Sequence, residues 1–484
     1  MNKNKPWSLV VQRVSTSTAS IWIGNLFAGV QFPFAARVDL LSSGKLIASQ
    51  HVEVWLRPYT GLAQGFYALL NFNQLTVSDD YQVKLLLQEA SGSEFVSICS
   101  GQFRCLPNCI PRIGQKPFTI GFGSCFSNQD DNGQVSSAYA ALYDRGSPDT
   151  CPDITFLVGD QVYLDIGFAS LIPFSGFIRR RIANRYAQNW QALAGVFTRG
   201  GTWMLPDDHE YWNDYPFNNL PILALHSLKI PSVRKVWEST ATDAANHIQS
   251  AAMVEVIDIG ADLSICLANL RSQRTDNQFM SAEEFVRLIE WAKNLTVPGV
   301  LVIQQLLMDT LGQGERNLPS FTDQYSQLVA ALAETGNDIL VLSGDVHFGR
   351  VASVSLGNKG AVLTEAVASP LSNLKGLLNG LAADVADNNP EVFPPLKDDV
   401  VGVPKVKVTY SDAYKVSSKP GRRFSVYPVS RTDEHFMTAS FVRVADDMLE
   451  VSIDAWRVRE PDVHTGLPSP GFESTFKIKL RAKS

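Results

Sequence analysis

Residues 154–165 read ITFLVGDQVYLD, an apolar run that stops at side chains able to bind a metal. The run at 154–158 is too short for a helix and rich in β-branched and aromatic residues, which indicates a strand of an α/β sheet buried on both faces. Gly159 allows the chain to turn. Asp160 then lies at the carboxyl end of the strand, where open α/β sheets bind their ligands.

The same pattern recurs later in the chain. Residues 339–347 read ILVLSGDVH, again an apolar strand, a glycine, an aspartate and a metal-capable side chain. Two such strand ends, carrying Asp160 and Tyr163 in one case and Asp345 and His347 in the other, predict a shared metal centre.

Length and composition describe an ordinary globular protein of more than one domain. The chain has 484 residues, of which 45% are hydrophobic and 19% charged, and its net charge is −6. At roughly 100–200 residues per domain, we expect two domains. An acidic chain lacks the basic face of a nucleic-acid-binding protein, but a small phosphate ester needs only a local positive site. The sequence does not predict the oligomeric state.

The sequence predicts neither a membrane span nor a disulfide framework. No apolar run reaches the roughly 20 residues that a span requires, and the residues after the basic N-terminus alternate instead of forming a signal peptide. We therefore expect a cytoplasmic protein, or a periplasmic or secreted one if a leader has been removed. Six cysteines in so long a chain indicate unpaired thiols. A zinc site at Cys99, Cys105 and Cys109 is the weaker alternative because no histidine lies nearby.

The first hundred residues predict an antiparallel β-sandwich. Short alternating segments occur at 20–23, 36–40, 51–55, 81–85 and 95–98, separated by turn residues. A Pro- and Gly-containing stretch follows them. We therefore predict a fibronectin III-like domain at 1–112 and a catalytic domain at 113–484.

Beyond residue 113, strands alternate with helices, which predicts a largely parallel sheet. We expect a helical insertion at 177–197, whose run Arg179 to Arg181 forms a solvated face, and a capping box at Ser281 that opens a helix ending near Asn294. Segment 371–423 is rich in Gly, Pro, Asn and Asp, and we predict that it overhangs the site as a lid. The C-terminal tail returns to strands.

Most of the chemistry-bearing side chains follow predicted strands. They are Cys125, Asp160, Tyr163, Asp207, Asp208, His209, Asp345 and His347. A thiol and a phenol do not suit a magnesium or calcium shell. They suit Fe(III) or Zn(II), which lowers the pKa of a bound thiol or phenol enough to ionise it, while the other carboxylates and an imidazole fit a second, divalent ion.

These residues predict roles in phosphate chemistry. Two neighbouring ions bridged by Asp160 would bind phosphate oxygens and hold a hydroxide for in-line attack. His209, next to a metal carboxylate, would protonate the departing alkoxide. Asp165 is expected to bond turn amides. Arg271 and Arg274 fit either a substrate clamp or an ion pair that supports the site.

Four motifs together resemble the alkaline phosphatase D (PhoD-like) family of metallophosphoesterases. In this sequence they are Gly123-Ser124-Cys125, residues 159–165, Asp207-Asp208-His209-Glu210 with Asn213 after it, and Gly344-Asp345-Val346-His347. The chain departs from the family's Asp-x-Arg-x-x-Arg run, because Asn269 takes the first place before Arg271 and Arg274.

The resemblance implies a fold and a reaction. It implies a calcineurin-like core of two packed mixed sheets flanked by helices, preceded by a β-sandwich, and hydrolysis of phosphate monoesters or diesters. It also implies Fe³⁺ held by Cys125, Asp160 and Tyr163, with a divalent ion near Asp208 and Asp345. Calcium is the expected divalent ion, with Zn²⁺, Mn²⁺ and Mg²⁺ as alternatives.

Two other functions stay open at this point. Within the enzyme class, the alternative is a phospholipase-like enzyme or a nucleotide phosphodiesterase. Outside it, the alternative is a degenerate relative that acts as a binding module. The complete set of metal-capable side chains favours an enzyme, with Asp208, His209 and Arg271 as its catalytic residues.

Overall fold

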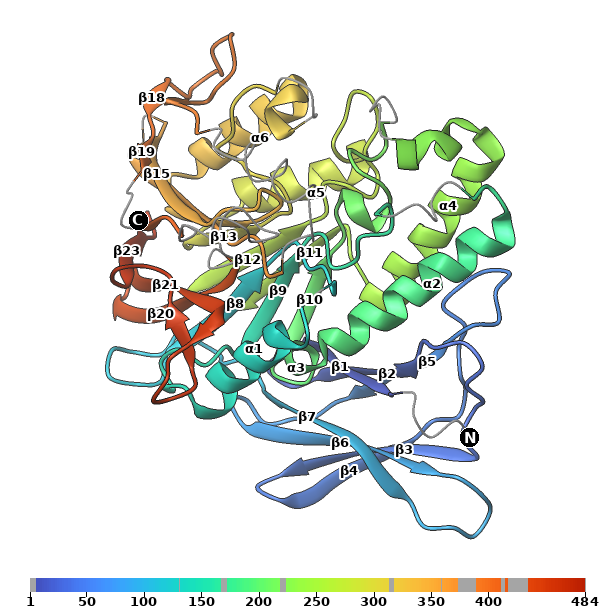
Figure 1. The fold of residues 1–484 in the computed structure, drawn as a ribbon. Coiled ribbons are helices and arrows are strands. Elements are labelled where there is room, and N and C mark those ends of the chain that lie inside the picture. Colours follow the sequence, from blue (N-terminus) through green and yellow to red (C-terminus); the bar gives the residue numbers. More distant parts are fainter. Residues whose placement is uncertain are drawn as a thin grey trace.

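The computed structural model describes residues 6–129, 131–166, 172–217, 223–312, 317–357, 359–372, 389–410, 414–416 and 434–483. The N-terminal strands form one end of the molecule, and the α/β part with its helices lies above them in the view of Figure 1.

Two antiparallel sheets make up the N-terminal part, so the predicted sandwich is confirmed. One sheet has the order β1-β2-β5 (Ser8–Val14, Ala19–Asn25, Phe66–Phe72), and the other has the order β4-β3-β6-β7 (Lys45–His51, Ala35–Ser42, Asp80–Gln88, Val96–Arg104). The strand predicted at 51–55 is wrong. The strand at this place is β4, whose pairing with β3 runs from Lys45 to His51 and ends there at the His51–Arg37 pair.

The first sheet of the α/β part contains the strand that opened the sequence analysis. Its order is β10-β9-β8-β20-β21-β22, with β23 paired to β21 (Gly201–Leu205, Ile154–Val158, Phe118–Gly123, His435–Ala445, Met448–Pro461, Pro468–Pro470, Phe476–Arg481). Strands β8, β9 and β10 run parallel, so their carboxyl ends meet at one edge. The C-terminal strands join antiparallel to β8, which makes the sheet mixed.

The second α/β sheet contains the other predicted strand end. Its order is β11-β12-β13-β14-β16-β15-β19 (Val254–Ile259, Leu263–Ala268, Gly299–Val302, Ile339–Ser343, Ala361–Val367, Arg350–Leu356, Thr409–Tyr410). Strands β12, β13, β14 and β16 are parallel. β11 pairs antiparallel with β12 at one edge, β15 pairs antiparallel with β16, and β19 pairs antiparallel with β15 at the other edge. A short pair, β17 and β18 (Val392–Phe393, Val406–Lys407), stands apart.

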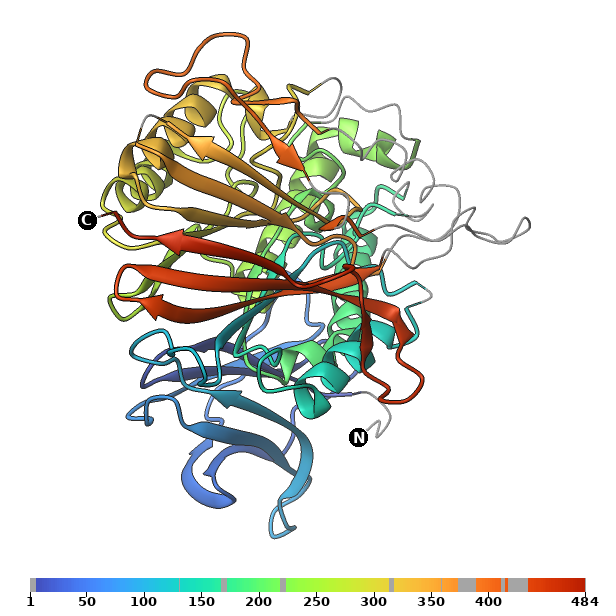
Figure 2. The ribbon, with the colours of Figure 1, turned by 90° about the vertical axis from the view of Figure 1, so that its left-hand side faces the viewer.

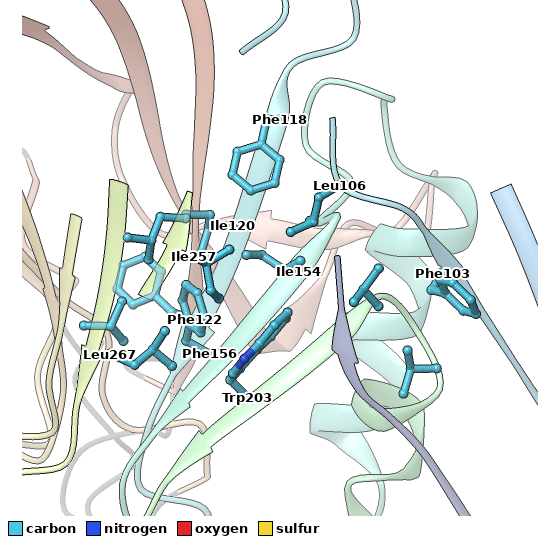
Figure 3. Close-up of a cluster of buried hydrophobic side chains, with 14 of the residues drawn as sticks. Phe103, Leu106, Phe118, Ile120, Phe122, Ile154, Phe156, Trp203, Ile257 and Leu267 are labelled. Carbon is cyan, nitrogen blue, oxygen red and sulfur yellow. The ribbon is translucent and has the colours of Figure 1, made fainter. Parts of the chain in front are cut away.

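The two α/β sheets pack face to face with helices outside them, as Figures 1 and 2 show. Side chains from both sheets, such as Phe156 and Leu267, share one core with the N-terminal strands (Figure 3). Helices α1, α2, α3 and α4 (Gln134–Arg145, Ser175–Ala192, Ala194–Phe197, Pro231–Ala244) cover the first sheet. Helices α5 and α6 (Ala282–Lys293, Thr322–Thr335) cover the second.

One hydrophobic core extends across the predicted boundary between the two domains. Val83 of the sandwich and Ile120 of the first α/β sheet belong to the same buried cluster. The division at residues 112 and 113 stays a prediction.

Three local predictions need correction or fall outside the described residues. The insertion is two helices, α2 and α3, and Arg181 in the arginine run is buried instead of solvated, with Nη2 2.8 Å from the carbonyl of Ile166. Helix α5 begins as predicted, but the Ser281 side chain makes no capping bond. About half of the predicted lid at 371–423, namely 373–388, 411–413 and 417–423, lies outside the described residues.

Among the helices that the structure describes, none combines the length and apolar character needed to cross a membrane.

Candidate metal centre

The predicted ligands follow the carboxyl ends of four parallel strands from two sheets. Cys125 follows β8, Asp160 follows β9, and Asp207 and Asp208 follow β10 in the first sheet; Asp345 follows β14 in the second. The packing of the two sheets brings these ends together. A hydrogen bond also joins the two strand ends, because the side-chain hydroxyl of Ser124, just before Cys125, accepts the Asp345 N–H at 3.1 Å.

Three groups of ligand atoms form, and they share members. Within each group the atoms lie within 4.8 Å of one another: Cys125, Asp160 and Asp345; Asp160, Asp208 and His209; and Asp207, Asp208 and Asp345. Asp160, Asp208 and Asp345 each belong to two of the groups. The bridging role of Asp160 stays a prediction.

The backbone at this centre is held in an unusual conformation. Cys125, Asp160, Asp345 and His347 all have left-handed backbones, with φ of 58°, 57°, 74° and 38°. Such a conformation costs a non-glycine residue about 1–3 kcal/mol, and it persists where the surrounding structure enforces it. All four residues come shortly after strand ends, and the ligand atoms of Cys125, Asp160 and Asp345 lie within 4.8 Å of one another.

Burial and mutual repulsion dominate the electrostatics. The pKa of Asp160 lies well above its usual value, mainly because the carboxyl group is buried. The charge of His209 lowers this pKa, but the neighbouring acids Asp208, Asp207 and Asp345 raise it further. Burial and nearby carboxylates likewise raise the pKa of the Cys125 thiol and the Tyr163 phenol. A cation among them would reverse each of these shifts, because it stabilises the ionised forms.

Unpartnered buried atoms at this place fit a cation. Among the described residues, Asp207 Oδ2, Asp208 Oδ1 and His347 Nδ1 are buried without a hydrogen-bond partner. Buried carboxylate oxygens normally have a partner, and an ion supplies one. The donor set of thiol, phenol, imidazole and carboxylates therefore fits a metal centre.

Tyr163 and His347 lie together on one side of the centre. Tyr163 packs against Cys125, and its hydroxyl is 3.3 Å from His347 Nε2. Burial lowers the pKa of His347 to about 4, helped by the charge of His209. The imidazole is therefore neutral at ordinary pH, the state in which histidine binds a metal.

His209 is held in a different way from the residues around it. Both oxygens of Asp165 lie 2.9 and 3.0 Å from His209 Nδ1, and the Asn213 N–H donates to Asp165 at 2.8 Å. Burial disfavours the charged imidazole, but Asp165, Asp208 and Asp160 outweigh it and raise the pKa of His209 well above its usual value. Asp165 thus bonds one amide, as predicted, and also orients His209, which was not predicted.

The two arginines after β12, Arg271 and Arg274, are buried, and each connects to an acidic side chain of the centre. Arg271 is fully buried, pairs through Nε with Asp207 Oδ1, and donates from Nη1 to the Tyr215 carbonyl at 3.0 Å. Of the two roles left open, this geometry corresponds to the supporting ion pair. Arg274 donates at 2.6 Å to Gln305, whose amide nitrogen donates at 3.2 Å to Asp345.

Glu210 organises the loops that carry the ligands, a role that the sequence analysis did not assign. Its carboxylate accepts the N–H groups of Asp160, Gln161, Val162 and Asp207 at 2.6–3.2 Å. The loop after β9 is thereby joined to the loop after β10. Its capping box with Asp207, three residues earlier, follows a known spacing. The three amides of the loop after β9 lie about 50 residues away, and no spacing rule connects them to Glu210.

Gln304 and Gln305 were also missed, although a signal was present. They follow β13 just as Asp345 follows β14, so the strand-end argument applies to them too. Gln304 donates to the Pro206 carbonyl at 2.8 Å and thus holds the main chain directly before Asp207.

Comparisons with known proteins identify the fold. No family model and no curated protein sequence matches the chain. A solved structure of PhoD matches with a TM-score of 0.63 at 13% identity, over 99% of this chain and 91% of that one. Two other solved structures have TM-scores too low to indicate a shared fold. One is a redesigned β-sandwich protein, with a TM-score of 0.15 at 13% identity over 21% of this chain and 92% of that one. The other is a family 123 glycoside hydrolase from Clostridium perfringens, with a TM-score of 0.18 at 9% identity over 67% of this chain and 65% of that one. The chain has the PhoD fold, as the motifs predicted.

Proposed function

We propose that this protein is a metal-dependent hydrolase of phosphate monoesters or diesters, of the alkaline phosphatase D type. One observation carries the proposal: a thiol, a phenol and four carboxylates meet at one buried strand edge, where two carboxylate oxygens have no partner among the described residues. The PhoD fold supports it, because the same motifs that predicted the fold also supply these side chains.

The residues present would hold two ions. Cys125, Asp160 and Tyr163 suit Fe³⁺, which favours ionised thiol and phenol ligands. Asp208 and Asp345, with Asp160, would hold the divalent ion, and we propose calcium because carboxylate oxygens make up that side. His347, whose Nε2 lies 3.3 Å from the Tyr163 hydroxyl, would instead serve the Fe³⁺ side, which an imidazole nitrogen suits. When bound, the ions supply positive charge that polarises a phosphoryl oxygen and makes a water molecule more acidic.

The protein's own side chains would bind and orient the reactants. Without cations, the four carboxylates of this edge would repel a phosphate ester. Arg271 neutralises Asp207 and keeps it facing the centre. His209 lies at the partly exposed margin, with a side chain 14% exposed, and Asp165 fixes its Nδ1. The other ring nitrogen would donate a proton to the leaving alkoxide.

Metal analysis and visible absorption test the proposal without a substrate. Protein expressed with iron should contain iron and absorb visible light through the Tyr163 phenolate. Tyr163→Phe should lose the absorption while it remains folded. Tyr139→Phe is the matched control, since Tyr139 is buried and bonds Thr155 away from the centre.

A panel of phosphate esters tests the reaction itself. Bis-p-nitrophenyl phosphate and the monoester distinguish a diesterase, including a phospholipase-like or nucleotide-cleaving enzyme, from a monoesterase. A protein that is colourless, free of iron and inactive towards every ester after expression with iron would refute the enzyme and favour a binding module.

A further inference from the structure

A short π-helical turn connects the N-terminal sheets with the metal centre. It is η4, Ala245–Gln249, between α4 and β11, and Ser250 ends it in a left-handed conformation with φ of 52°. π-helical turns are rare and occur frequently at functional sites. Ala245 at its start and Ile248 and Gln249 at its end are buried, so both ends of the turn are packed inside the protein.

Side chains of the sandwich hold the turn from one side. Gln12 of β1 donates to the Ile248 carbonyl at 3.2 Å, and Trp22 of β2 donates from Nε1 to the His247 carbonyl at 3.0 Å. The hydroxyl of Tyr67, on β5, lies 3.1 Å from His247 Nδ1. All three strands of one N-terminal sheet therefore bond this single turn.

The last residue of the turn reaches the metal-centre loops. Gln249 Nε2 donates to Gln161 Oε1 at 2.7 Å and to Glu210 Oε1 at 3.1 Å. Both partners are acceptors, which fixes the orientation of the Gln249 amide. Glu210 in turn accepts the N–H groups of Asp160 and Asp207, two of the candidate ligands.

We propose that Gln249 is a positioning residue of the metal centre, and that the N-terminal sheet acts through it as a structural part of that centre. The sheet fixes η4, Gln249 fixes Glu210, and Glu210 fixes the backbone from which Asp160 and Asp207 project. The expected effect on metal binding rests on the proposed metal-dependent function. The hydrogen bonds from the sheet through Gln249 to Glu210 do not depend on it.

Amide hydrogen exchange and metal affinity test the proposal in the full chain. Gln249→Leu keeps the side-chain size and removes both hydrogen bonds. We expect on the order of tenfold faster exchange at the amides of residues 160–162, and about tenfold weaker binding of iron and calcium by titration calorimetry. Tyr67→Phe should act in the same direction but more weakly, about threefold, since it removes one bond a step further away.

Tyr81→Phe is the matched control. Its hydroxyl accepts the Thr76 N–H at 2.7 Å in the other N-terminal sheet, with no hydrogen bond to η4. It should change neither exchange at 160–162 nor metal affinity. The proposal is overturned if Gln249→Leu leaves both unchanged, or if Tyr81→Phe changes them as much as Tyr67→Phe. If Gln249→Leu does not fold, hydrogen exchange at 160–162 and metal affinity are compared between Tyr67→Phe and Tyr81→Phe. The proposal then requires a change in Tyr67→Phe and none in Tyr81→Phe.

Failure of this inference and failure of the proposed function give different results. Unchanged exchange with an active, metal-loaded enzyme refutes the positioning role alone. Faster exchange at 160–162 in a protein that binds no metal refutes the function and leaves the contact chain intact.

Discussion

The buried pair of Arg271 and Asp207 allows a sharp test of how the centre is held together. Both side chains have no exposed surface, so solvent does not screen their interaction. Arg271→Met would leave a buried carboxylate unpaired, which costs about 3–5 kcal/mol. It would also remove the donor to the Tyr215 carbonyl, which adds about 1 kcal/mol. We therefore expect a loss of about 4–6 kcal/mol in the free energy of unfolding.

The assay is urea unfolding of metal-free protein, followed by tryptophan fluorescence. Arg271→Met combined with Asp207→Asn should recover a large part of the loss, because the carboxylate that Arg271 neutralises is then uncharged as well. The control is Lys477→Met, which breaks an exposed pair with Glu450 and should change stability by less than about 0.5 kcal/mol. If Arg271→Met lies within about 1 kcal/mol of the wild type, or the double variant is less stable than the single one, the charge-pair argument is wrong.

Two further predictions concern other buried carboxyls. Glu210→Gln should lower the free energy of unfolding by about 2–4 kcal/mol, because the amide nitrogen would face the N–H groups of Asp160 and Asp207. The measurement is urea unfolding at pH 9, above the pKa of about 8 to which burial raises this carboxyl group. An unchanged urea midpoint would contradict the prediction. Burial raises the pKa of Asp309 to about 6, against the opposing bonds from Asn317 and an amide. The folded state thus keeps a proton that the unfolded chain releases, so stability should fall by up to about 3 kcal/mol between pH 4 and pH 6. Asp309→Asn should flatten that decline in urea midpoints; an equal decline in both proteins would exclude Asp309 as its source.

The strand ends were predictable because they combine two strong signals. Residues 154–158 and 339–342 are short, fully apolar and β-branched, and each is followed by a glycine and an aspartate. The parallel order of β8–β10 and of β12–β14 places the carboxyl ends at one edge within each sheet, and the packing of the two sheets brings these edges together. Short alternating segments predicted the sandwich, and the resemblance carried by four ordered motifs added the two-sheet core.

What could not be predicted depends on contacts across long sequence distances. Glu210 and Gln249 act on main-chain amides and side chains that no periodicity connects to them. Arg181 appeared to belong to a solvated run, but the neighbouring helix α4 covers it, with Trp237 5.4 Å from its guanidinium. Helical spacing alone cannot distinguish a helix face that meets water from one that meets another helix.

The left-handed backbones at Cys125, Asp160, Asp345 and His347 have a consequence for protein design. Grafting these side chains onto another scaffold would reproduce the chemical groups without the main-chain bends that aim them. A faithful transplant would have to carry whole loops together with the inert residues that clamp them. For this chemistry, the smallest transferable unit is a stretch of constrained polypeptide.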